Sequence, residues 1–389
     1  MPHDRALYHW QGRLATRLPD LPEAHRRWLA RASFGVALAG SAAVTAVALH
    51  LALALALPAA TALQRLRELY RPAAAKPGHR RRGFDHAACF APLLRWAAGD
   101  APRLALAPDP TDLAGRLRVL AVCLLYGSCA IPLAWAVRPI NAPGSWDDAW
   151  AELLDALRAA LGEGREVLVL TDRGLESPEL FRAIVARGRH PLMRAKAAGH
   201  FRPAGWRRGR PMGQFAAAEG RRWKGAGVAY PGGSRLACTP LACREPGHAE
   251  AWLVLTDLAP AAADASWYGR RGWIEAGSRR LKSGGWRIES CRMTEPDRAA
   301  RWLTAAALAT LWAPESAGAA AAGPLARPGR SGRPACGAGL FRLGAVWLRV
   351  LLGRDEPAAP GRWLEPAWPI DPRPSDPPEE DPPCQAAPS

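Results

Sequence analysis

The chain has 389 residues and a formal net charge of +17 at pH 7, a length that can bury a sizeable core and hold two or three domains. The basic excess favours a polyanionic partner such as nucleic acid. Only four of the 52 basic residues are lysine, and abundant Arg, Ala, Gly and Pro are typical of proteins from GC-rich genomes, so codon bias is an alternative source of the charge. No Walker-type loop, His-Glu-x-x-His or Gly-x-Ser-x-Gly sequence occurs, so an ATPase, a zinc protease and a serine hydrolase have no support.

The first hundred residues have a helical pattern. No charged residue occurs from Ala32 to Gln64, and Pro58 interrupts this run. The run is long enough for a membrane span, but its many alanines, its small polar residues and Pro58 favour two packed helices. The second helix is amphipathic and basic over 61–70 and can lie on DNA. We therefore expect residues 1–100 to form a helical domain able to bind DNA, with a membrane protein as the less favoured alternative.

Residues 101–195 alternate strand and helix patterns. Gly127-Ser128 is a hairpin-turn sequence between two apolar runs, and Ser145 is a helix N-cap residue. Two of the strands end in an acid, Asp109 and Asp172. The predicted elements are strands 103–109, 116–126 and 129–137, a helix 145–161, a strand 166–172, a helix 177–187 and a strand 190–195.

The composition changes at residue 199. Residues 199–251 are rich in Gly, Pro and Arg, which favours a β-rich insertion. A strand over 251–258, a helix that begins at Asp264 and a helix over 295–312 follow. We expect a catalytic domain over 101–313 with its insertion at about 199–251. Residues 314–389 are of low complexity, contain one apolar island at 340–352, and are predicted to be largely disordered.

Three strands, a helix and a further strand is the order of a ribonuclease-H-like sheet. In that arrangement the first strand and the strand after the helix are neighbours. Asp109 and Asp172 would then lie side by side at the carboxyl ends of strands, where open α/β sheets place their sites. The predicted fold class is therefore α/β, with a ribonuclease-H-like mixed sheet, flanking helices, a β-rich insertion and a helical N-terminal domain.

A third acid lies in the helix predicted from Asp264. Offsets of 0, 3, 7 and 14 place four residues within roughly 60° of one another on an α-helix; they are Tyr268, Arg271, Glu275 and Lys282. Three converging carboxylates suit divalent cations, which require oxygen ligands and act in pairs about 3.5–4 Å apart in phosphodiester chemistry. The cations on the stripe suit the phosphates of DNA.

Each acid also has a structural interpretation. Asp109-Pro-Thr-Asp112 is a good turn sequence, Asp172 is placed to cap a helix, and Glu275 is placed to pair with arginines one turn away. The order of the elements, the positions at strand ends and the helical stripe together favour a metal site. Of the first pair we choose Asp109, because it directly follows the apolar strand.

The spacing Tyr268-(2)-Arg271-(3)-Glu275-(6)-Lys282 resembles the Y-(2)-R-(3)-E-(6)-K signature of bacterial insertion-sequence transposases of the cut-and-paste DDE class. Asp109-Pro-Thr111 and Leu170-Thr-Asp172-Arg-Gly are similar to the motifs that carry their first two acids. The resemblance covers roughly residues 104–312.

The resemblance implies a metal-dependent DNA transposase. Asp109, Asp172 and Glu275 would be the catalytic residues and would bind Mg²⁺, with Mn²⁺ as an alternative. Tyr268, Arg271 and Lys282 would bind DNA. Further implications are a homodimer on the terminal inverted repeats and target DNA, no membrane partner, and a cytoplasmic, nucleoid-associated location. The alternative is a non-catalytic DNA-binding protein, such as an inactive transposase copy.

Overall fold

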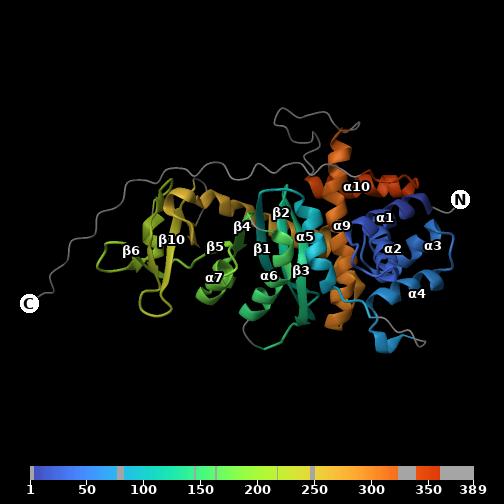
Figure 1. Ribbon diagram of the computed structural model, residues 1–389, viewed down its shortest axis with the longest axis horizontal. Helices are drawn as coiled ribbons and strands as arrows, with labels where there is room; N and C mark the ends of the chain where they lie inside the picture. The colour runs from blue at the N-terminus through green and yellow to red at the C-terminus, as the bar shows by residue number, and fades with distance from the viewer. Residues whose placement is uncertain are drawn as a thin grey trace, which may run out of the picture. The chain divides into compact units, whose positions relative to one another are not determined.

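The computed structural model describes residues 4–76, 83–143, 146–162, 164–216, 218–245, 250–322 and 339–359 (Figure 1). These residues divide into two compact units. Unit 1 contains residues 4–165 and 272–359, and unit 2 contains residues 166–271. Unit 1 is therefore built from two separate stretches of chain, whereas unit 2 is one continuous stretch.

Unit 1 begins with five helices. Gly40, in the left-handed region with φ 58°, ends the second of them, and Pro58 precedes the fourth. The apolar run predicted to form two helices is thus divided twice, because Gly40 adds a break before the one at Pro58. The helices are α1 (Asp4–Arg17), α2 (Glu23–Ala39), α3 (Val44–Ala54), α4 (Ala59–Tyr70) and α5 (Phe90–Ala98).

The apolar run from Ala32 to Gln64 can be compared with the length and apolarity that a membrane span requires. Among the described residues, no single helix has the length and apolarity to cross a bilayer. By length and composition alone, α2 and α3 pass that test as a pair, but they are bent by 95° with respect to each other.

Among the described residues, unit 1 contains three antiparallel strands. They are β1 (Arg103–Leu113), β2 (Leu117–Tyr126) and β3 (Cys129–Pro139), in the order β3-β2-β1. Gly127 and Ser128 both have positive φ, 50° and 63°, as a type I′ hairpin turn requires. The predicted hairpin at this position is confirmed.

Helices pack on this sheet. They are α6 (Asp147–Leu161), α8 (Gly272–Arg279) and α9 (Pro296–Ala322). Gly277 allows α8 to approach β3 closely, because a Cβ atom there would lie 2.4 Å from the Cβ of Ala130. α6 begins at Asp147 with Trp146 in the N-cap position. The predicted N-cap, Ser145, lies outside the described residues.

The C-terminal part of unit 1 is more helical than its composition predicts. α9 continues through Pro314 to Ala322, and the apolar island forms α10 (Leu340–Gly353), which packs against α9 (Figure 1). A Cβ atom on Gly344 would lie 1.7 Å from the carbonyl oxygen of Ala313, so α10 lies very close to α9. The predicted disorder of 323–338 and 360–389 falls outside the described residues.

Unit 2 contains the remaining strands. β4 (Glu166–Thr171) pairs in parallel with β5 (His190–Arg194), and α7 (Pro178–Val185) connects them. β11 (Trp252–Thr256) is antiparallel to β5, and β10 (Leu236–Cys243) is antiparallel to β11. The insertion adds β6 (His200–Pro203), β7 (Arg210–Pro211), β8 (Arg222–Lys224) and β9 (Gly227–Ala229).

The predicted fold class is confirmed. The chain has a mixed sheet with flanking helices, a helical N-terminal region, a β-rich insertion and the element order of a ribonuclease-H-like fold. The helix predicted to begin at Asp264 is wrong in form. Residues Ala265–Arg271 are a 3₁₀ helix, α8 follows, and Arg280–Gly284 form a π-helical turn.

Candidate functional site

Asp109 lies inside β1. The strand continues to Leu113, and Asp109 has Ala121 of β2 as its neighbour. The prediction that the strand ends at Asp109 is therefore wrong, because pairing with β2 outweighs the local turn signal of Asp-Pro-Thr-Asp. The hydroxyl of Ser278 on α8 donates a hydrogen bond to Oδ2 of Asp109 at 3.0 Å.

Asp112 has a different environment. Side chains alternate along a strand, so Asp112, three residues from Asp109, belongs to the opposite face of β1. Arg118 of β2 donates two hydrogen bonds to it, at 2.6 and 3.1 Å. The bonds from Arg118 hold the pKa of the Asp112 carboxyl below its ordinary value, and the charge of Lys282 adds to this effect. Asp112 is thus already engaged as an ion-pair partner.

Glu275 is an exposed residue of α8. Residues three apart on a helix are neighbours on its surface, so Glu275 lies one turn from Ser278, which binds Asp109. Asp109, Ser278 and Glu275 thereby share one region of unit 1. Lys282 is partly buried in the π-helical turn that follows, and it is near enough to Asp112 to affect the pKa of that carboxyl.

Asp172 directly follows β4 in unit 2 and caps the 3₁₀ turn Arg173–Leu175. Its Oδ1 accepts hydrogen bonds from the backbone N–H groups of Gly174 at 2.9 Å and Leu175 at 3.1 Å. Its Oδ2 lies 3.4 Å from Nη2 of Arg271. The side chain remains 42% exposed, so this carboxylate is oriented by three groups and is still open to solvent.

Tyr268 and Arg271 are buried, with 4% and 6% of their surface exposed. The hydroxyl of Tyr268 donates to the carbonyl oxygen of Thr171 at 3.1 Å, and burial raises the pKa of Tyr268 to about 12. The sequence predicted that both side chains bind DNA. The structure places both against the end of β4, next to Asp172.

Two residues near these acids were missed from the sequence. Ser278 has a weak signal, since it lies three residues after Glu275. Arg194 ends β5 and lies over the Tyr268 ring, 6.0 Å from its centroid. Nothing in the local sequence marks Arg194, because its position depends on the pairing of β5 with β4 and β11.

Asp109, Asp172 and Glu275 each offer carboxylate oxygens, the type of ligand that hard divalent cations take. Asp109 and Glu275 lie in unit 1 and Asp172 lies in unit 2. Within the described part of the chain, no group of three or more His, Cys, Asp or Glu side chains is arranged to hold a metal ion.

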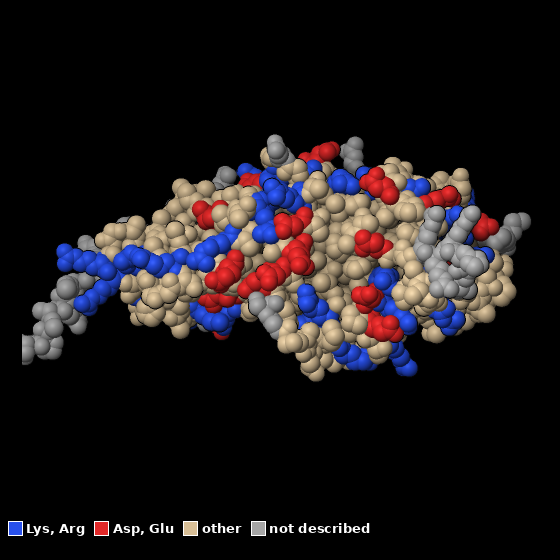
Figure 2. All heavy atoms as spheres, turned by 60° about the horizontal axis from the view of Figure 1, so that its bottom comes forward, with Lys and Arg blue, Asp and Glu red and all other residues tan. Residues whose placement is uncertain are grey.

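Basic side chains are prominent on both units. In unit 2, Figure 2 shows Lys and Arg side chains along the insertion, where Arg207, Arg208 and Arg235 are exposed. In unit 1, a groove of ≈ 550 Å³ is lined by α1 and the start of α2, including Arg17 and Arg27. These surfaces are suited to phosphate groups.

Residues 144–312 match the family model of the transposase DDE domain. This stretch of the chain is therefore similar to the DDE domain of transposases. Comparison with curated proteins gives no match.

Proposed function

We propose that the protein is a DNA transposase that cleaves phosphodiester bonds at transposon ends and joins those ends to target DNA. The observation that carries the proposal is the contact between α8 and β1. The helix that bears Glu275 is attached at Ser278 to Asp109, within a chain whose residues 144–312 match the transposase DDE domain.

We assign the catalytic carboxylates to Asp109, Asp172 and Glu275. Bound Mg²⁺, or Mn²⁺ in its place, supplies the Lewis-acid chemistry of phosphodiester hydrolysis. Asp109 is fixed by a strand ladder and by Ser278, and Asp172 by two backbone N–H groups and Arg271. Two of the proposed ligands are therefore oriented by the protein, while Glu275 is exposed on α8.

DNA is the proposed partner. We assign Lys282 to a contact with a phosphate near the scissile bond. We assign contacts with the flanking duplex to the exposed arginines of the insertion and to the basic helix α4. The proposed DNA partners are the terminal inverted repeats and the target DNA, and a homodimer would hold them. A DNA partner of this kind implies a location at the nucleoid in the cytoplasm.

The test is cleavage of a duplex taken from the repeats that flank the gene. Wild-type protein is expected to cut it only with Mg²⁺ or Mn²⁺. Asp172→Ala and Glu275→Ala are expected to abolish cutting and to keep DNA binding, because each removes a proposed metal ligand and no positive charge. Asp112→Ala is the matched carboxylate control. Cutting at the wild-type rate by either variant would refute the assignment.

The second candidate is a non-catalytic DNA-binding protein, favoured by the exposed arginines of the insertion. The same experiment separates the two functions. The non-catalytic function would be indicated if the protein binds the repeats in a salt-dependent way but does not cleave them with any metal ion tested.

A further inference from the structure

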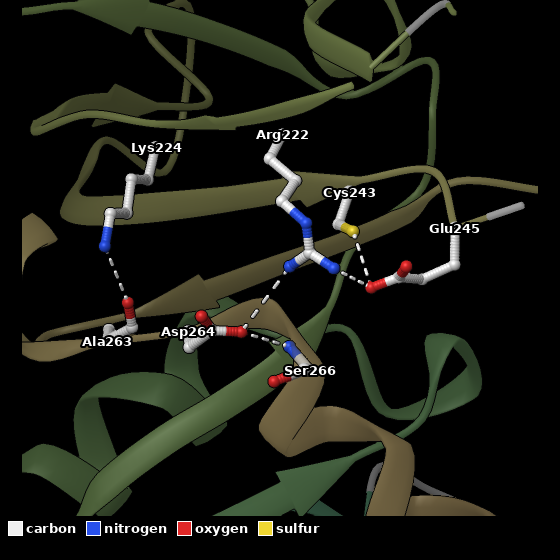
Figure 3. A network of polar contacts seen from close by, with 7 residues as sticks. All are labelled: Arg222, Lys224, Cys243, Glu245, Ala263, Asp264 and Ser266. Carbon is white, nitrogen blue, oxygen red and sulfur yellow. Dashed lines mark hydrogen bonds and ion pairs between the residues drawn. The ribbon is translucent and has the colours of Figure 1, made fainter. Parts of the chain in front are cut away.

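A polar network inside unit 2 links the insertion to the segment that precedes Arg271 (Figure 3). Arg222 of β8 bonds to Glu245, and its other terminal nitrogen lies 3.9 Å from Oδ1 of Asp264. Asp264 is 4% exposed. Lys224, at the other end of β8, donates to the carbonyl oxygen of Ala263 at 3.2 Å. Two cations of the insertion are thus used in contacts inside the protein.

Asp264 also starts the next element. Its Oδ1 accepts a hydrogen bond from the backbone N–H of Ser266 at 2.7 Å, and the 3₁₀ helix Ala265–Arg271 follows directly. This helix carries Tyr268 and Arg271, which contact Thr171 and Asp172 at the end of β4. A continuous series of contacts therefore runs from β8 to the Asp172 carboxylate, entirely within unit 2.

We propose that Arg222 and Asp264 are positioning residues that fix the Asp172 carboxylate through the segment Ala265–Arg271. Tyr268 and Arg271 then act on the end of β4 and on Asp172, and the phosphates of DNA are bound by other cations. The proposal rests on the proposed function only where it assigns Asp172 to catalysis. The physical connection between Arg222 and Asp172 is a property of unit 2 alone.

Burial makes this connection strong. Removing one partner of a buried ion pair leaves the other charge uncompensated in a medium of low dielectric, so the remaining group must move toward solvent or change its protonation. Asp264 has almost no exposed surface, so we expect the loss of Arg222 to weaken the anchor of the segment that follows and to let that segment shift. A shift of Arg271 removes one of the three groups that orient Asp172. Metal ligands depend on such supporting contacts for their affinity.

The first experiment follows backbone hydrogen exchange in DNA-free protein and needs no activity. The amides of Gly174 and Leu175 are the probes, because both donate to Asp172. Arg222→Ala and Asp264→Asn are expected to speed their exchange about tenfold, as local opening becomes easier. Arg222→Lys keeps the charge and is expected to restore slow exchange. Arg207→Ala removes an exposed arginine of the same insertion and serves as the control.

The second experiment measures cleavage of the repeat DNA as a function of Mg²⁺ concentration. Arg222→Ala and Asp264→Asn are expected to lose about 10–100-fold in metal affinity or rate, with half-maximal cleavage at higher Mg²⁺ and with partial rescue by Arg222→Lys. Asp264→Asn preserves the shape of the side chain, so it keeps the test open if Arg222→Ala does not fold.

The two experiments separate the two proposals. Faster exchange at Gly174 and Leu175 in the variants supports positioning even if the wild-type protein cuts no DNA, in which case the proposed function fails alone. Unchanged exchange together with an unchanged Mg²⁺ requirement in folded Asp264→Asn would overturn the positioning role while leaving the transposase function intact.

Discussion

Ser278 on α8 donates a hydrogen bond of 3.0 Å to Asp109 on β1, across 169 positions of sequence. The bond uses one lone pair of Oδ2. It connects the proposed first ligand to the helix that bears Glu275.

Ser278→Ala is expected to lower Mg²⁺-dependent cleavage by about 10–100-fold, because a supporting hydrogen bond to a metal ligand is lost. The free energy of unfolding should fall by only about 1 kcal/mol. Ser278→Thr keeps the hydroxyl and is the matched control. A thermal or denaturant titration beside the cleavage assay separates the two effects, and equal cleavage by the alanine and threonine variants would count against the role of the bond.

Asp109 and Asp112 should respond differently to alanine. Asp109→Ala is expected to be inactive at every Mg²⁺ concentration, because it removes a proposed ligand. Asp112→Ala should retain cleavage and lose about 0.5–1 kcal/mol of stability, since it breaks a partly exposed ion pair with Arg118. End cleavage at several Mg²⁺ concentrations distinguishes them, and the reverse pattern would move the first ligand to Asp112.

Gly277→Ala should destabilise the protein by about 1–3 kcal/mol through overpacking. The added methyl would lie 2.4 Å from the Cβ of Ala130, so α8 must move away from β3. Gly12→Ala in α1 is the control, because a Cβ there meets nothing within 4 Å; it should stabilise its helix by about 0.5–1 kcal/mol. Urea unfolding of both variants measures the difference in stability. An equal loss of unfolding free energy in Gly12→Ala and Gly277→Ala would contradict the prediction.

His190 should make stability depend on pH. Its hydrogen bond from Nδ1 to Asp257 raises the pKa of the His190 imidazole above the ordinary value of 6.5. The folded state therefore holds the proton more tightly, and this stabilisation is complete below about pH 6.5 and lost as pH rises through the folded pKa. For a partly exposed pair we expect about 0.5–1 kcal/mol. Urea unfolding of the wild type and of His190→Gln between pH 6 and 9 checks this prediction. The free energy of unfolding of the variant should lack the decline that the wild type shows as pH rises.

Lys282→Ala is expected to weaken binding of the repeat DNA and to reduce the slope of log K against log[salt] by about one unit, as for one lost phosphate contact. Fluorescence anisotropy at several salt concentrations measures this slope. Lys196→Ala removes an exposed lysine of unit 2 and tests whether any lysine gives the same change. An unchanged slope in Lys282→Ala would place Lys282 outside the DNA contact.

Local signals in the sequence were sufficient for elements that depend on neighbouring residues. The turn at Gly127-Ser128 is signalled locally, because Gly127 adopts positive φ without steric cost and Gly-Ser is a common two-residue hairpin sequence. The acids Asp147 and Asp148 in the first turn of α6 are equally local. The fold class followed from the order of such elements.

The details of the candidate site depend on contacts distant in sequence. Asp109 lies inside β1 because β2 pairs past it, which Asp-Pro-Thr-Asp alone does not indicate. Residues 265–284 divide into 3₁₀, α and π forms, which the single helical period read from the sequence does not indicate. A uniform α-helix placed Tyr268 and Glu275 on one stripe, whereas the structure buries the first and exposes the second.

The close packing of α10 on α9 has a consequence for synthesis of the chain. Ala317 and Ala320 of α9 are buried with Leu343 of α10, and Gly344 leaves room for the Ala313 carbonyl. On the ribosome, α9 is made before α10. The alanine face of α9 is therefore exposed until α10 packs on it, and during that time it is open to chaperones and proteases. We expect a polypeptide interrupted before Leu340 to be degraded quickly, so that a gene damaged there yields little protein.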